Sequence, residues 1–347
     1  MFDHRHYIPV LRWKAAEKDA IKYLTEEQKS IITPLLELVP PQPRKNKTIE
    51  ELTKELIANT ARDIGVYWGN QAVFLDIALI DEPHRTLGLN EIITEGVNLG
   101  LKIIPVVGLN SSDQILKVAS EYSKRFGICL RLTLSDLESE TLVTKIEGFL
   151  SNTQLAEVNV DLMIDMKVIN NNDNQKLASK IPNIAKWRTF FISGGAFPRD
   201  LTNFSVGQHL LKRTDWELWV KGISNGFVRK PSFSDYTIQH PIYYTPVPGA
   251  NVSASIRYTI DEDWIIMRGQ GVRTEGSSGS SQWPANAQLL SNRKEFKGGG
   301  FSFGDNYILD KGKDLNTKKT GSARTWLTAG INHHLVNVIH QLSNLRV

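Results

Sequence analysis

Cysteine and long apolar runs are what this sequence of 347 residues has least of. Its single cysteine, Cys129, excludes an internal disulfide and is consistent with a reducing compartment. Because Cys129 lies in an apolar run with no histidine nearby, we expect a buried structural thiol rather than a nucleophile. No run of about 18 apolar residues is present, so we expect no membrane-spanning segment and no membrane partner.

Export signals and two common nucleotide-binding loops are also missing. The N-terminal segment MFDHRHYIPV lacks the basic-then-apolar order of a signal peptide, so we expect a cytoplasmic protein. No Gly-x-Gly-x-x-Gly follows the first predicted strand, which argues against a dinucleotide-binding sheet. The glycine-rich run 298–304 is not followed by Gly-Lys-Ser/Thr, which excludes a P-loop there.

The positive charge lies mostly in the C-terminal part of the chain. The whole sequence has a net charge of +4. Residues 201–347 hold 17 Lys and Arg against 11 Asp and Glu, whereas residues 1–200 hold 24 against 26. This asymmetry favours either an anionic partner or a solvated basic surface on the C-terminal part.

Short apolar strands alternate with helices through the first 245 residues. The strands begin near residues 7, 33, 72, 102, 128, 159, 189 and 232, and amphipathic segments separate them. One helix, Thr48 to Ile64, opens with the Thr-x-x-Glu form of a capping box. These units predict an α/β fold, a (β/α)8 TIM-like barrel over residues 1–245, with an open doubly wound sheet as the alternative.

The pattern changes after residue 245. Residues 253–268 indicate a hairpin with an acidic turn, 285–296 a helix, 301–309 a glycine-bounded loop and strand, and 323–342 a closing helix. We therefore predict a C-terminal α+β subdomain over residues 246–347 that packs on the barrel.

Polar residues stand at the C-terminal ends of the predicted strands, where such barrels carry their active sites. In the first strand, Ile8, Val10, Arg12 and Lys14 share one face, which begins apolar and ends in two cations. The strand-end candidates on the other strands are Glu37, Asp76, Arg131, Asp165, Lys167, Ser193, Asp235 and Tyr236. Together they predict a polar ring around the barrel mouth.

Glu37, Asp76 and Asp165 come from three separate strands, and converging carboxylate oxygens are what Mg²⁺ or Mn²⁺ requires. We treat these three as candidate catalytic residues and metal ligands, with magnesium or manganese as the candidate cofactor. A phosphate or carboxylate would be held by the cations of the ring, Arg12, Lys14 and Arg131. The alternative is that these charges neutralise one another as buried ion pairs that close the barrel.

A glycine-rich turn, Ser193 to Pro198, follows the seventh predicted strand. Backbone N–H groups at Ser193, Gly194 and Gly195 would cradle a phosphate, as the loops after strands seven and eight do in many barrels. A plain tight turn is the alternative. The tryptophans, Trp326 among them, are expected in the core or at docking surfaces rather than as stacking platforms.

Several segments carry a family resemblance: Tyr7–Lys14 with Glu17, Ser193–Pro198, Pro231–Tyr236, Ser253–Tyr258, Trp264 with Arg268-Gly269, Phe301–Asp305, and Thr325-Trp326 with Asn332–Leu335. Together they resemble the "beta protein" family of bacteria and their phages along nearly the whole chain. Arg12 stands where the family pattern leads us to expect lysine. The resemblance implies an association with anti-phage defence. It also adds candidate ligand-binding residues, Arg257, Arg268 and His333, which lie within these motifs with Asp305 and Asn332.

We therefore predict a component of bacterial anti-phage defence that acts on or binds a nucleic acid, a nucleotide or another phosphorylated ligand at the barrel mouth. If it is an enzyme, a metal-activated water attacking phosphorus is the expected reaction. One alternative is a non-catalytic sensor or scaffold that binds a nucleic acid or a protein partner from a defence operon. Another is a sugar hydrolase with two of the carboxylates as acid and base.

Overall fold

A computed structural model describes residues 2–169, 174–224, 227–245, 247 and 249–345. Parallel strands close into a barrel in the order β1, β2, β3, β4, β5, β6, β7, β9, which confirms the predicted (β/α)8 fold. The strands are β1 (Tyr7–Arg12), β2 (Leu35–Glu37), β3 (Val73–Asp76), β4 (Ile103–Val107), β5 (Ile128–Thr133), β6 (Val160–Val168), β7 (Thr189–Gly195) and β9 (Ser232–Asp235).

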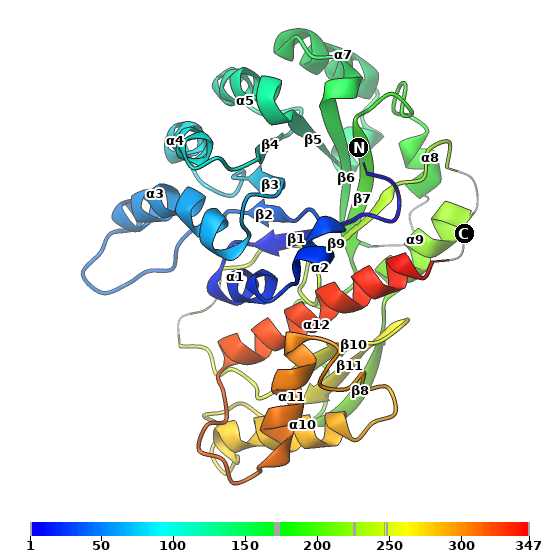
Figure 1. Cartoon of the computed structure of the whole chain (residues 1–347). Helices are drawn as coiled ribbons and strands as arrows, with labels where there is room; N and C mark the ends of the chain where they lie inside the picture. Colours follow the sequence, from blue (N-terminus) through cyan, green and yellow to red (C-terminus); the bar gives the residue numbers. More distant parts are fainter. Residues whose placement is uncertain (1, 170–173, 225–226, 246, 248, 346–347) are drawn as a thin grey trace.

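Helices surround the barrel strands (Figure 1). They are α1 (Ala15–Lys22), α2 (Glu26–Ser30), α3 (Ile49–Tyr67), α4 (His84–Asn98), α5 (Asp113–Phe126), α6 (Leu134–Glu138), α7 (Leu142–Thr153), α8 (Asn174–Ala178) and α9 (Thr214–Ser224). The predicted capping box forms at α3, where Thr48 accepts from the backbone N–H of Glu51 and Glu51 accepts from that of Thr48. Among the described residues, no helix combines the length and hydrophobicity needed to cross a membrane.

Apolar side chains fill the barrel interior below a polar layer. Phe74 of β3 and Phe191 of β7 meet there, with ring centroids 5.5 Å apart. The interior cluster contains Ile8, Val10, Leu35, Phe74, Ile104, Val106, Cys129, Met163, Phe191 and Tyr236. Cys129 is fully buried and burial raises the pKa of its thiol, as expected for a structural cysteine.

Strand register places the predicted polar residues at one level. Arg12 pairs in register with Glu37, and Glu37 with Asp76. On the other side of the barrel, Asp165 pairs in register with Ser193. Because the strands are parallel, these residues all lie at the C-terminal end of the barrel, which we call the mouth.

The C-terminal part forms an antiparallel sheet in the order β10 (Ile256–Thr259), β11 (Asp263–Arg268), β8 (Gly207–Lys212). This sheet packs with α10 (Gln282–Ser291), α11 (Phe303–Lys313) and α12 (Ala323–Ser343). We call the sheet and these three helices the appendage. Strand β8 comes from within residues 1–245, so the appendage also uses a segment that the sequence assigned to the barrel.

The strand predicted at residues 301–309 is wrong, because α11 occupies most of that segment. Ser302 begins the helix: its side chain accepts from the backbone N–H of Asp305, and its hydroxyl donates to the Asp305 carboxylate at 2.5 Å. The glycines before Ser302 suggested a loop and strand, but the Ser-x-x-Asp start is a helix cap.

Helix α12 joins the appendage to the barrel and runs between them (Figure 1). Thr328 and Asn332 donate to backbone carbonyls of Ala16 and Ala20 in α1, at 3.2 and 2.9 Å. All four residues are buried. The appendage is therefore held beside the β1 side of the mouth, and the space between them becomes part of the candidate site.

Candidate functional site

Arg131 on β5 lies at the centre of the polar ring. Its Nη2 donates to Glu37 Oε1 at 2.8 Å and to Asp165 Oδ2 at 2.6 Å, and its Nε donates to the same Asp165 oxygen at 3.0 Å. Its Nη1 donates to Asp76. Tyr236, which follows β9, donates its hydroxyl to Asp165 at 2.8 Å. We call these five residues the Arg131 cluster.

Opposite charges keep Arg131, Glu37 and Asp165 ionised. Burial raises the pKa of Asp165, but attraction to Arg131 and Lys167 outweighs burial and lowers this pKa to about 2. The pKa of Glu37 is lowered for the same reasons. Burial works against the charge of Arg131 too, yet the surrounding acids raise its pKa well above the usual value. The cluster is thus a set of buried ion pairs at neutral pH.

The geometry favours ion pairs over a metal at Glu37, Asp76 and Asp165. These carboxylates do converge, as predicted, but the guanidinium of Arg131 fills the space between them. Across the described part of the chain, no group of three or more His, Cys, Asp or Glu is arranged to hold a metal ion. The magnesium or manganese prediction therefore gains no support from the arrangement, whereas the ion-pair alternative accounts for it.

The pH dependence of stability should reveal these ion pairs. The pKa of Asp165 is about 2 in the folded protein and about 3.9 in the unfolded chain. This difference contributes about 2–3 kcal/mol to the free energy of unfolding above pH 4, and the contribution is lost as the pH falls toward 2. In Arg131→Met, burial would instead raise the carboxylate pKa values, so stability should fall as the pH rises above about 4. Urea unfolding from pH 3 to 8 measures both profiles; parallel profiles would contradict the ion pairs.

A cavity of about 370 Å³, the mouth pocket, opens beside this cluster. Its walls are largely apolar and come from the loops after β3 and β4. Lys167 lines it with φ of 52°, a left-handed conformation that is costly for a residue other than glycine. This backbone places Lys167 Nζ 3.3 Å from both Glu37 and Asp165. The predicted residue Lys167 is therefore a half-buried cation at the edge of the cluster.

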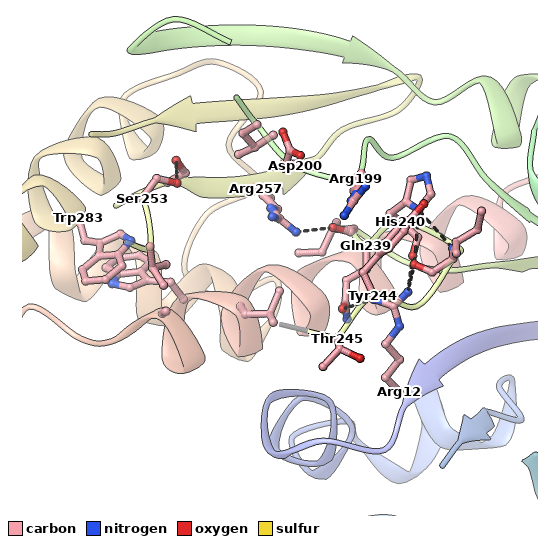
Figure 2. A pocket seen from close by; sticks show the side chains of 18 residues that line it. Arg12, Arg199, Asp200, Gln239, His240, Tyr244, Thr245, Ser253, Arg257 and Trp283 are labelled. Carbon is pink, nitrogen blue, oxygen red and sulfur yellow. Dashed lines mark hydrogen bonds between the residues drawn. The ribbon is translucent and has the colours of Figure 1, made fainter. Parts of the chain in front are cut away.

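A second cavity of about 390 Å³ lies where the barrel mouth meets the appendage (Figure 2). The barrel side is formed by Arg12 and the segment 238–245 that follows β9. The appendage side is formed by segment 252–257, Trp283 and the start of α12. Arg199 and Asp200, after β7, complete the lining. We call this cavity the junction cleft.

Three arginines converge on the junction cleft, and each is held by neutral groups. Arg12 Nη2 donates to the carbonyls of His240 at 2.5 Å and Ile242 at 2.9 Å. The Arg199 guanidinium lies 3.8 Å from the ring centroid of Tyr244. Arg257 is held by the backbone carbonyl of Ile238 and the ring of Phe197. Within the described residues, none of the three arginines forms an ion pair with a carboxylate.

Of the three arginines, Arg257 has no acidic group near enough to raise its pKa. Its Nη1 donates to the Ile238 carbonyl at 2.8 Å, and its guanidinium lies 4.7 Å from the ring centroid of Phe197. Burial lowers the pKa of Arg257 to about 10, and no acid raises it again. Arg257 therefore stays protonated at neutral pH, with a charge that a bound anion would stabilise.

Two other predicted cations lie near the cleft but do not line it. Lys14 Nζ lies 4.7 Å from the ring centroid of Tyr243, and burial lowers the pKa of this lysine. Arg268 donates from Nε to the Leu201 carbonyl at 3.1 Å and from Nη1 to its neighbour Gly269 at 2.6 Å. Both add positive charge around the cleft.

The glycines after Ser193 have a packing role. A Cβ atom at Gly194 would lie 2.2 Å from Ile169 Cδ1, and one at Gly195 would lie 2.7 Å from Pro241 Cγ. Ser193 is fully buried, and its Oγ has no hydrogen-bond partner among the described residues. The described linings of the mouth pocket and the junction cleft include none of the three. Close packing therefore explains this turn without a phosphate.

Asp235 connects the barrel to α12, whereas His333 holds α12 within the appendage. Asp235 accepts from the Tyr7 hydroxyl at 2.6 Å and lies 2.8 Å from His334 Nε2. His333 lies 2.7 Å from Asp305 through Nδ1. Asp235, His333, His334 and Asp305 are all fully buried. Their positions indicate a role in holding α12 rather than direct contact with a ligand.

Sequence reasoning missed Arg199, Trp283 and the junction cleft itself. Arg199 directly follows the Ser193–Pro198 turn, in the loop after β7 that often binds phosphate in barrels, so a signal for it was present. Trp326 was expected in the core and is 3% exposed, but it also lines the cleft.

Comparison with known proteins agrees with the resemblance found in the sequence motifs. No curated protein matches the chain. A family model described as "Beta protein" matches residues 7–340, which span both the barrel and the appendage. The chain therefore belongs to the Beta protein family.

Proposed function

We propose that this protein binds a phosphate-bearing ligand in the junction cleft, where Arg12, Arg199 and Arg257 contact its anionic oxygens. The observation that carries the proposal is the meeting of three arginines that form no ion pair among the described residues, although the Asp200 carboxylate in the same cleft attracts Arg199. Elsewhere in the molecule, half-buried Arg131 and Arg188 do form ion pairs, whereas buried Arg213 is also held by neutral oxygens. Guanidinium groups match the geometry of phosphate oxygens and bind them through paired N–H groups.

The arginines are held in place before a ligand arrives. Arg12 is fixed by carbonyl acceptors and Arg257 by the Ile238 carbonyl, while Arg199 lies against Tyr244. No hydrogen bond from Arg257 Nε or Nη2 to another described residue is found, so these N–H groups remain for a ligand. Side chains that are already ordered lose less conformational entropy on binding.

The Arg131 cluster argues against metal-dependent phosphoester hydrolysis, so we propose a binding function. Its carboxylates are engaged by Arg131 and Lys167, which leaves them less free to act as metal ligands or as a general base. The predicted role in anti-phage defence rests on the family resemblance and stays a prediction. A sensor that recognises a phosphorylated ligand would fit both the resemblance and the cleft.

Calorimetric titration with inorganic pyrophosphate tests the proposal. Arg257→Met is expected to weaken binding by about tenfold to a hundredfold, which is the loss of one or two charge-assisted hydrogen bonds. Its melting temperature should not fall, because methionine removes a half-buried charge that has no ion-pair partner among the described residues. Raising NaCl from 50 to 200 mM should weaken binding to the wild-type protein, since the contacts are ionic.

The matched control is Arg62→Met. This variant removes an exposed arginine of α3 that lines neither cavity. It should bind pyrophosphate like the wild-type protein. Equal affinity in Arg257→Met and wild type, or no binding at millimolar pyrophosphate, would overturn the proposal.

A further inference from the structure

We infer that the phosphate-bearing ligand of the junction cleft is a nucleotide; this inference rests on the function proposed above. Figure 2 shows that the cleft has two unlike ends, with Trp283 on one side, Arg12 and Arg199 on the other, and Ser253 and Arg257 between them. A ligand that fills the cleft needs an anionic end and an apolar end.

The apolar end is built from aromatic and aliphatic side chains. Trp283 and Trp326 lie with ring planes 17° apart and centroids 6.4 Å apart, and Val252 and Leu327 extend the same wall. Trp283 is 4% exposed, and its indole N–H has no hydrogen-bond partner among the described residues. The N–H of Trp326, by contrast, donates to the Thr320 carbonyl at 3.0 Å.

The apolar wall, rather than this donor, points to the ligand, because the indole N–H groups of Trp13 and Trp264 are also buried without an acceptor among the described residues. A nucleobase is a flat, largely apolar group. An inorganic phosphate would satisfy the arginines but leave the Trp283 end of the cleft unfilled. A base placed there would cover the apolar wall.

Hydroxyl groups lie between the two ends. The hydroxyls of Ser253 and Ser255 are 2.9 Å apart, and both serines line the cleft. Such groups suit the hydroxyls of a ribose, which lie between base and phosphate in a nucleotide. The volume of about 390 Å³ falls in the range typical of pockets that enclose small organic ligands. The order of groups along the cleft therefore matches the order of groups in a nucleotide.

The experiment compares inorganic pyrophosphate with a panel of ribonucleoside mono- and triphosphates by calorimetry. At least one nucleotide should bind tenfold or more tightly than pyrophosphate. Trp283→Leu keeps an apolar side chain but removes the aromatic face, so it should weaken nucleotide binding about threefold to tenfold and leave pyrophosphate binding unchanged. Arg257→Met should weaken both ligands.

The outcomes separate the inference from the proposed function. If pyrophosphate binds and every nucleotide binds no more tightly, the nucleotide inference fails while the phosphate site stands. If neither binds, both fail. If a single-stranded oligonucleotide binds more than tenfold tighter than every mononucleotide, the ligand is a polymer and the inference is wrong. An equal loss of both ligands in a correctly folded Trp283→Leu would also contradict the placement of the base.

Discussion

Replacing Arg131 with methionine is expected to lower the free energy of unfolding by about 3–5 kcal/mol. The substitution removes the cation that Glu37, Asp76 and Asp165 share and leaves these buried carboxylates with Lys167 alone. Methionine has a similar length, so lost volume contributes little to the effect. Urea denaturation of both proteins at pH 7 measures the difference.

The control for this prediction is Lys54→Met, which breaks an exposed i,i+4 pair with Glu50 on α3. Exposed pairs of this kind contribute little, so no measurable change is expected. A loss below about 1 kcal/mol in Arg131→Met would show that the cluster is not a set of mutually dependent ion pairs.

His333→Phe is expected to cost a similar amount, about 3–5 kcal/mol, for a related reason. The two ring nitrogens of His333 lie 2.7 Å from Asp305 Oδ2 and 2.7 Å from the Thr259 carbonyl oxygen. The carboxylate and the carbonyl are both hydrogen-bond acceptors, and both are buried against this ring. Phenylalanine fills the same space but removes the hydrogen bonds of the ring to both acceptors, which leaves Asp305 with the hydroxyls of Ser302 and Tyr258.

Helix α12 offers a matched control for His333→Phe. His340 lies on the same helix but is exposed, with its ring centroid 5.9 Å from that of Phe301. His340→Phe should therefore leave the melting temperature nearly unchanged. If both variants melt at the same temperature, His333 does not anchor the appendage as its hydrogen bonds indicate.

The barrel was predictable because local patterns repeat eight times along the chain. Alternation of strands and helices, and the Thr48-x-x-Glu51 cap, depend on neighbouring residues and are visible in the sequence. Strand β8 was not predicted because most of its residues are exposed at the edge of a sheet. Its pairing with β11 is a long-range contact that no local pattern announces.

The Arg131 cluster was predictable as a set but not in its chemistry. Strand periodicity placed Glu37, Asp76, Arg131 and Asp165 at one level of the barrel. Periodicity does not say whether carboxylates that converge hold a metal ion or an arginine. That choice depends on how far the Arg131 side chain reaches from β5 across the mouth to β2 and β3, which only the three-dimensional arrangement shows.

The junction cleft could not be predicted, because its walls come from six separated parts of the chain. Arg12, Arg199, Arg257 and Trp326 meet only after α12 packs against α1 and β10. The sequence did indicate an excess of positive charge after residue 200, and Arg257 lies in that part. Charge counts alone do not show which cations lack an acidic partner.

A crystal structure of the protein with bound pyrophosphate would show where the anion binds. We expect phosphate density in the junction cleft, with oxygens about 3 Å from the guanidinium nitrogens of Arg257 and Arg12. Phosphate density in the mouth pocket beside Lys167, with the junction cleft empty, would contradict it.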